Sequence, residues 1–240
     1  MPPRLIPLLC ALLLLLGGRD SAAAPGLWGW QAVLVAGDYA QPVFDNGVAA
    51  MEQWLVSRGV AAQSIRRLSA TQRPGQASPE PASAERILGH IAALRPRPGE
   101  GCFVFITSHG YRGEGIWLAY SGEYLRPESL AQALSAGCAA APTVVVVSGC
   151  FTGAFTAMRA PNRIVITAAR HDRPSFGCQA DRTYTVFDEC LLGALPRAST
   201  WRGAFSATDG CVRRREQQMQ VTPSQPQASF GAAVRGLRLR

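Results

Sequence analysis

Short, nearly continuous apolar runs alternate along this chain with segments whose apolar residues recur at helical spacing. The apolar runs lie at 30–38, 102–108, 143–149 and 163–169. Strands buried on both faces of a parallel sheet have this composition. The helical segments lie at 44–59, 83–94, 126–136 and, around a turn, 183–220. Such alternation predicts an α/β fold with a mostly parallel central sheet.

The remaining segments predict edges and connections of that sheet. Residues 63–69 and the end of 221–231 indicate short edge strands, and the glycine-rich segment 110–125 indicates a strand pair. Residues 71–83 are rich in Pro, Ser and Gly, which is typical of a surface loop. A second loop is predicted at 171–183.

The first 24 residues have the pattern of a secretory signal. An early Arg4 precedes the apolar block Leu5–Leu16, and small residues at Ala22–Ala24 follow. The block is too short to span a bilayer as a helix, so we expect it to be removed and residues 25–240 to form one domain. A retained anchor is the alternative. The mature protein is expected to be exported, periplasmic or secreted, without stable membrane insertion.

The chain is basic, with a formal net charge of +8, and all of its basic residues except histidine are arginine. Nucleic-acid surfaces usually cluster basic residues among aromatic ones. Here the arginines scatter, apart from a cluster at Arg213–Arg215 and a few at the C-terminus. A solvated basic surface explains this pattern better, so no nucleic-acid partner is predicted.

Six cysteines remain once Cys10 is removed with the signal. Export permits disulfides, and Cys102 and Cys138 each precede an apolar run that predicts a strand. Neighbouring parallel strands would bring these two together at one edge, so a Cys102–Cys138 bridge is a specific prediction. If Cys150 stays a free thiol, the other three cysteines cannot be paired from the sequence, and one of them is left over.

Two apolar runs end on reactive side chains. FVFITSHG at 103–110 leads to His109, and VVVVSGC at 144–150 leads to Cys150. Chemistry in open parallel sheets gathers at the carboxyl ends of strands, so neighbouring strands would place both side chains in one crevice. An imidazole favours the thiolate form of a nearby thiol and can protonate a leaving amine. The backbone N–H groups of Cys150 and Gly110 are the predicted oxyanion donors.

Other chemistries lack their required residues. A cysteine phosphatase loop needs arginine six positions after the cysteine, where Thr156 stands. A nucleophile elbow needs glycine two residues to either side, where Ser148 and Thr152 stand. No close Cys/His spacing indicates zinc, and no G-x-G-x-x-G follows the first apolar run, so no metal and no cofactor are predicted.

These motifs resemble those of the legumain-like cysteine peptidases, family C13 of the caspase-like clan. The resemblance rests on S-H-G and S-G-C after apolar strands, on W-x-x-V-L-V-A-G from Trp30, and on P-S-Q-P-Q at 223–227, which is similar to the terminal element of bacterial members. It implies a caspase-like three-layer α/β/α sandwich. It also implies that His109 and Cys150 form a dyad hydrolysing peptide bonds through a thioester, with Gly110 as the oxyanion glycine.

The resemblance also suggests a substrate pocket, with some departures. Ser175 and Phe176 would flank the residue before the cut, with Asp181 nearby. Ser148 stands where legumains carry a pocket glutamate, so asparaginyl specificity is not implied. Asn46 either orients the histidine or caps a helix.

The predicted function is that of an exported cysteine endopeptidase acting on peptides or proteins. A transpeptidase of the same chemistry and an inactive caspase-like scaffold that binds peptides are the alternatives. His90 and His171 lack the setting of His109 and are predicted to be structural or solvent-facing.

Overall fold

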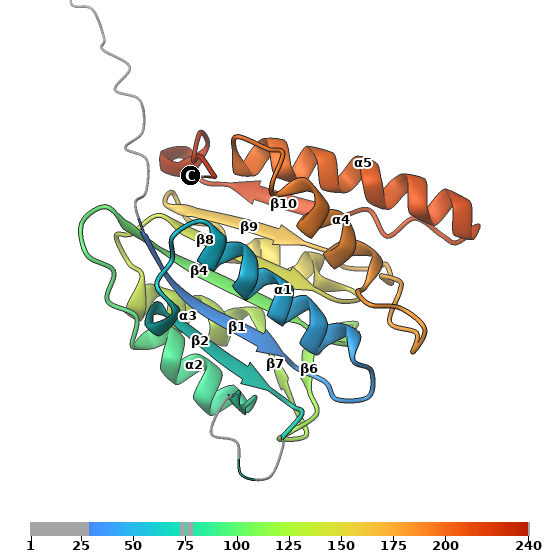
Figure 1. Ribbon diagram of the computed structural model, residues 1–240, viewed down its shortest axis with the longest axis horizontal. Helices are drawn as coiled ribbons and strands as arrows, with labels where there is room; N and C mark the ends of the chain where they lie inside the picture. Colours follow the sequence, from blue (N-terminus) through green and yellow to red (C-terminus); the bar gives the residue numbers. More distant parts are fainter. Residues whose placement is uncertain (1–28, 73–74, 76–78, 240) are drawn as a thin grey trace, which may run out of the picture.

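A seven-stranded sheet forms the centre of the protein (Figure 1). The computed structural model describes residues 29–72, 75 and 79–239, so the predicted signal lies outside the described residues. The strands are β1 (Gly29–Ala36), β2 (Ile65–Ser69), β3 (Glu80–Pro81), β4 (Glu100–Thr107), β8 (Thr143–Ser148), β9 (Arg163–Thr167) and β10 (Gln227–Phe230). Their order is β10-β9-β8-β4-β1-β2-β3. Only β10 pairs antiparallel to its neighbour, which confirms the mostly parallel sheet.

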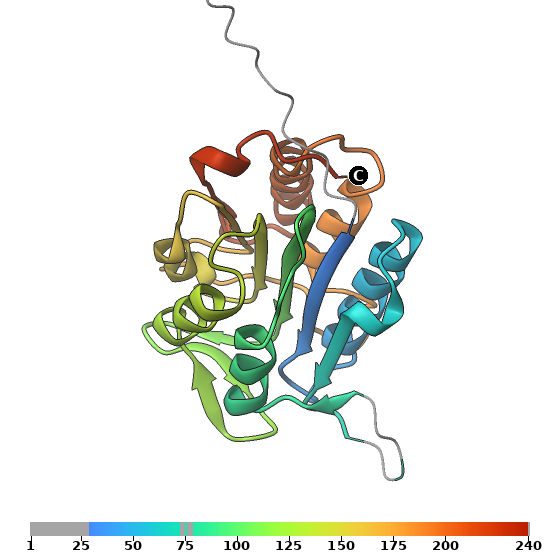
Figure 2. The same ribbon diagram turned by 90° about the vertical axis from the view of Figure 1, so that its left-hand side faces the viewer.

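Helices cover both faces of this sheet, which gives the three predicted layers (Figures 1 and 2). One face carries α1 (Val43–Ser57), α4 (Val186–Ala194) and α5 (Trp201–Met219). The other carries α2 (Ala84–Ala92), α3 (Pro127–Gly137) and the short 3₁₀ helix η2 (Thr152–Met158). Two further 3₁₀ turns are η1 (Ala62–Ser64) and η3 (Ala232–Val234).

The strand side chains alternate between the two cores. Phe103 and Phe105 of β4 pack into the layer of α1, α4 and α5, whereas Val104 and Ile106 pack against α2 and α3. All four are fully buried. Burying one such side chain contributes about 1.5–3 kcal/mol, so β4 and its equally apolar neighbour β8 form a rigid platform.

Two details differ from the sequence prediction. The segment 110–125 forms three antiparallel strands rather than a pair, namely β5 (Gly110–Tyr111), β6 (Gly115–Leu118) and β7 (Glu123–Leu125). The two-residue β3 also pairs outside β2, so β2 is not the edge of the sheet. Strands as short as β3 and β5 cannot display a period of two, which is why the pattern did not reveal them.

Two disulfides cross-link the fold, one between the sheet and the end of α3 and one between two helices of the same layer. Cys102 bonds to Cys138, as predicted, although Cys138 follows α3 directly and Cys102 already lies within β4. Cys190 of α4 bonds to Cys211 of α5, a pair that the sequence left open. Cys150 and Cys178 are the free cysteines of the described chain.

Candidate active site

The register of β4 and β8 brings the two reactive residues together. Thr107 pairs with Ser148 across these adjacent parallel strands, and His109 and Cys150 each follow two residues later. Both side chains are half-buried and line the same pocket at the carboxyl edge of the sheet. The two apolar runs therefore deliver the imidazole and the thiol to one place.

Glycines let the two loops after these strands pack backbone against backbone. A Cβ added to Gly110 would lie 2.0 Å from the carbonyl oxygen of Cys150, and one on Gly149 would lie 2.6 Å from that of Ser108. Real Cβ atoms do not approach so closely, so each loop requires the glycine of its partner. Phe151, directly after Cys150, has a φ of 61°, a left-handed conformation that is rare for a bulky residue. Such strained positions cluster at functional sites.

The thiol of Cys150 is held by the backbone of the loop at 171–183. The N–H of Ser175 donates to Sγ at 3.2 Å, and the Sγ–H in turn is 3.4 Å from the carbonyl oxygen of Ser175. Burial raises the pKa of the Cys150 thiol, and a negative charge on Cys178 would raise it further. The Ser175 N–H opposes this effect because it favours the thiolate. The thiol is thus positioned but predominantly protonated at neutral pH.

The imidazole of His109 is positioned by packing. The ring of Phe44, from the first turn of α1, meets it edge-on with centroids 5.2 Å apart. The backbone is fixed as well, because the carbonyl of His109 accepts a hydrogen bond from the N–H of Trp117 in β6 at 2.9 Å. Within the described residues the imidazole has no hydrogen-bonding partner, which leaves both ring nitrogens available to a substrate or to the thiol.

Asn46 neither orients His109 nor caps α1. Its side-chain amide donates to the carbonyl oxygen of Thr183 at 3.0 Å, and its backbone N–H bonds to Pro42 inside the helix. Asn46 therefore ties α1 to the loop at 171–183. The sequence could not show this, because the two partners are separated by 137 positions.

The pocket beside the dyad is small. Its open volume is about 20 Å³, which is enough for one water molecule and too little for an amino-acid side chain. Ser148, Ser175 and Phe176 line it, as the sequence suggested for a substrate pocket, whereas Asp181 is exposed and does not. The other lining residues are Phe44, Ser108, His109, Gly149, Cys150, Cys178 and Thr185.

A protein-family model matches the part of the chain that contains this site. The model of the peptidase C13 family matches residues 83–198, which contain β4, β8, both reactive residues and the loop at 171–183. Over these residues the chain belongs to the peptidase C13 family. The three-layer sandwich is accordingly the caspase-like fold that the resemblance implied. A comparison with curated proteins found no match.

This C13 chain also places a buried carboxyl group beneath its dyad, at Asp188 in the first turn of α4. The side chain is fully buried, and its Oδ2 accepts a hydrogen bond from the hydroxyl of Thr107 at 2.7 Å. The hydroxyls of Ser148 and Thr185 also stabilise the carboxylate. Burial outweighs all three and raises the pKa of Asp188 to about 6, and Oδ1 accepts no hydrogen bond. The group thus joins the ends of the two strands that carry the dyad.

Sequence reasoning missed Asp188 because the surrounding letters have a simpler explanation. Thr185-Val-Phe-Asp188 has the spacing of a capping box, and the Thr185 hydroxyl does accept the N–H of Asp188 at 3.0 Å. The carboxyl group, however, turns to Thr107 of β4. The signal that remained was an acidic pair, Asp188-Glu189, inside an otherwise apolar segment, since buried acids are rare unless they have a specific partner.

The other histidines do not line this pocket. His90 contacts Glu80 at 2.9 Å, and His171 is exposed. In the described residues, no group of three or more His, Cys, Asp or Glu side chains could hold a metal ion. No helix in that part of the chain combines the length and hydropathy needed to cross a bilayer.

Proposed function

We propose that this protein is an exported cysteine endopeptidase in which Cys150 is the nucleophile and His109 the general acid and base. One observation carries the proposal: the register of β4 and β8 aligns Thr107 with Ser148, so that both reactive residues line one pocket. Membership of the C13 family supports a peptide or protein substrate.

The reaction would proceed in two halves. His109 takes the proton of the Cys150 thiol as Sγ attacks the scissile carbonyl, then gives that proton to the leaving amine, which leaves a thioester. Water, deprotonated by His109, then attacks the thioester and restores the thiol. These steps use only protein side chains and water, and no metal or cofactor takes part in them.

The developing oxyanion would be held by backbone N–H groups. The N–H of Cys150 donates no hydrogen bond within the described chain, so it is free to bind an oxyanion. Gly110 packs directly on the Cys150 backbone and is the proposed second donor. Removing one such donor typically costs roughly 10²–10³ in rate.

Substrate entry would require the pocket to open. The side chain before the cut would enter between Ser148, Ser175 and Phe176, where the open volume is about 20 Å³. Opening would separate Ser175 from Sγ and so free the thiol to meet His109. Asp181 lies at the exposed rim of the same loop, where it can contact a substrate without lining the pocket.

Export is proposed on two grounds. The pattern at residues 1–24 fits a signal that is removed, and two disulfides are typical of periplasmic or secreted proteins.

The proposal is tested by digesting a peptide library with the mature protein and with Cys150→Ala. Loss of the thiol is expected to abolish cleavage, while circular dichroism and the melting temperature stay close to those of the parent. Cys178→Ala, which removes the other free thiol of the pocket, is the matched control and should still cleave. Equal cleavage by the parent and Cys150→Ala would refute the proposal.

A peptide-binding scaffold without turnover is the second candidate. The absence of turnover is favoured by the small volume of the pocket, the raised pKa of Cys150 and the contact of Sγ with Ser175 rather than with His109. An inactive parent whose Cys150 reacts with iodoacetamide no faster than free cysteine would favour this candidate.

A further inference from the structure

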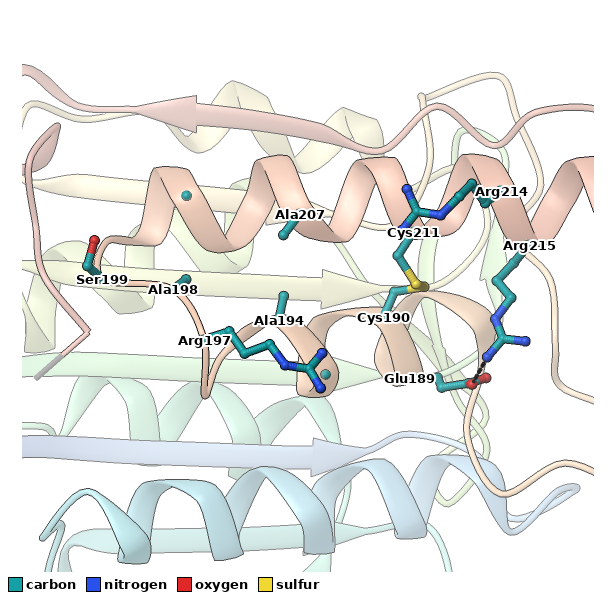
Figure 3. A pocket seen from close by; sticks show the side chains of 12 residues that line it. Glu189, Cys190, Ala194, Arg197, Ala198, Ser199, Ala207, Cys211, Arg214 and Arg215 are labelled. Carbon is teal, nitrogen blue, oxygen red and sulfur yellow. Dashed lines mark hydrogen bonds and ion pairs between the residues drawn. A yellow bond between two sulfur atoms is a disulfide. The ribbon is translucent and has the colours of Figure 1, made fainter.

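A groove between α4 and α5 lies on the same face of the sheet as α1 (Figure 3). Its volume is about 660 Å³, within the range of sites that bind ligands. Figure 3 shows the Cys190–Cys211 disulfide spanning the two helices at one end, with Ala194 and Ala207 facing each other across the hollow. The other lining residues are Glu189, Gly193, Arg197, Ala198, Ser199, Gly203, Arg214 and Arg215.

Small side chains make this groove and the disulfide makes it rigid. Glycine and alanine at positions such as Gly193, Ala194, Gly203 and Ala207 leave the space between the helices unfilled. A Cβ added to Gly193 would meet nothing within 4 Å. The disulfide between Cys190 and Cys211 fixes the two helices relative to each other at that point, with a Cα–Cα distance of 5.7 Å. A rigid site loses little conformational entropy when a ligand binds.

The rim of the groove carries unneutralised positive charge. Among the described residues, Glu189 is the only acid that lines it, and both of its carboxylate oxygens are already engaged, by Arg182 at 2.7 Å and by Arg215 at 2.6 Å. Arg197 and Arg214 form no ion pair with any described residue. Both are exposed, and Figure 3 shows Arg197 in the turn after α4 and Arg214 on α5.

One end of the groove is connected to the loop that holds the thiol of Cys150. Glu189 directly follows Asp188, the buried acid beneath the dyad. Its partner Arg182 belongs to the loop at 171–183, whose Ser175 holds Sγ of Cys150. A chain leaving the dyad over this loop would therefore reach the arginine rim.

We propose that the α4–α5 groove binds an acidic, extended segment of a polypeptide, with Arg197 and Arg214 contacting its carboxylates. Guanidinium groups pair with carboxylates bidentately, and a floor of small residues admits a peptide backbone. The idea that this segment belongs to a protein substrate rests on the proposed peptidase function. The binding itself does not.

Exposed arginines are common in this basic chain. The experiment therefore distinguishes an effect of the two groove arginines from an effect of the protein's net charge. The full-length mature protein carrying Cys150→Ala is titrated into a fluorescein-labelled peptide of alternating glutamate and glycine, and anisotropy gives Kd at low salt. The groove variant is Arg197→Glu/Arg214→Glu. Its matched control is Arg66→Glu/Arg159→Glu, which changes the same net charge at two exposed arginines outside the groove. A third variant, Ala207→Phe, fills the groove without altering its charge.

The groove variant is expected to raise Kd by about tenfold or more, since two attractive contacts become repulsive. Ala207→Phe should also weaken binding, the control should stay within about threefold, and a glutamine–glycine peptide should not bind.

Equal losses in the groove variant and the control would overturn the proposal, as would unchanged binding by Ala207→Phe. Displacement by inorganic phosphate at the concentration of the peptide would also overturn it, because the site would then bind simple anions. Since no cleavage is measured, these outcomes do not depend on the peptidase proposal.

Discussion

The dyad pocket and the α4–α5 groove share helix α4 but are built in opposite ways. Asp188, on one turn of α4, is fully buried beneath the dyad, while the next residue, Glu189, lines the open groove. The pocket has about 20 Å³ of open volume and the groove about 660 Å³. The first region is fixed by backbone packing and buried polar groups, and the second by a disulfide and exposed charge. Reacting groups need exact placement, whereas an extended peptide needs only space and complementary charge.

The largest change in stability is expected from a substitution at Asp188. Its pKa of about 6 in the folded protein lies above the ordinary value of 3.8, so the folded protein keeps a proton that the unfolded chain releases. The contribution of Asp188 to the free energy of unfolding is therefore complete below the unfolded-state pKa. It is lost as pH rises through the folded-state pKa, and the unfolding free energy falls by about 3 kcal/mol. Asp188→Asn stays neutral and can still accept the Thr107 hydroxyl, so it should remove this loss.

Urea unfolding across this pH range measures the prediction. Asp188→Asn should match the parent below the lower pKa and exceed it in unfolding free energy, by up to about 3 kcal/mol, above the higher one. Glu189→Gln changes the neighbouring, half-exposed acid of the groove and serves as the control. If the unfolding free energies of Asp188→Asn and the parent changed with pH by the same amount, the pKa of Asp188 would not be raised in the folded protein.

Replacing a glycine by alanine is expected to change the stability of the two regions by smaller amounts and in opposite directions. Gly110→Ala would place a Cβ 2.0 Å from the Cys150 carbonyl oxygen, so it should destabilise the fold by about 1–3 kcal/mol and lower any peptidase activity. Gly193→Ala adds a Cβ to α4 with nothing within 4 Å, and should stabilise the helix by about 0.5–1 kcal/mol. Chemical denaturation of both variants gives the two values. The same sign for both would remove the contrast between a packed pocket and an open groove.

The sequence predicted the regions to different extents. Continuous apolar runs revealed β4 and β8 because they are long and buried on both faces, and with them came the positions of His109 and Cys150. The Cys102–Cys138 bridge was predictable for the same reason. The two-residue strands were too short to show a period.

Contacts between distant segments could not be predicted. Thr107 and Asp188 are 81 positions apart, and their hydrogen bond exists only because α4 crosses the end of β4. The bond from Asn46 to Thr183 and the groove between α4 and α5 depend likewise on how helices pack. The arginine cluster at Arg213–Arg215 was visible, but its role was not, because Arg213 pairs with Asp209 and Arg215 with Glu189. Within this cluster, Arg214 alone forms no ion pair with a described residue.

His109 and Cys150 are proposed to act together in one crevice. The most direct test is kcat/KM on a single peptide substrate for the parent, His109→Gln and His171→Gln, the last altering an exposed histidine that does not line the pocket. Loss of a general acid and base should lower kcat/KM by about 10²–10⁴ in His109→Gln with the fold intact, and leave His171→Gln unchanged. Undiminished turnover by folded His109→Gln would contradict the account.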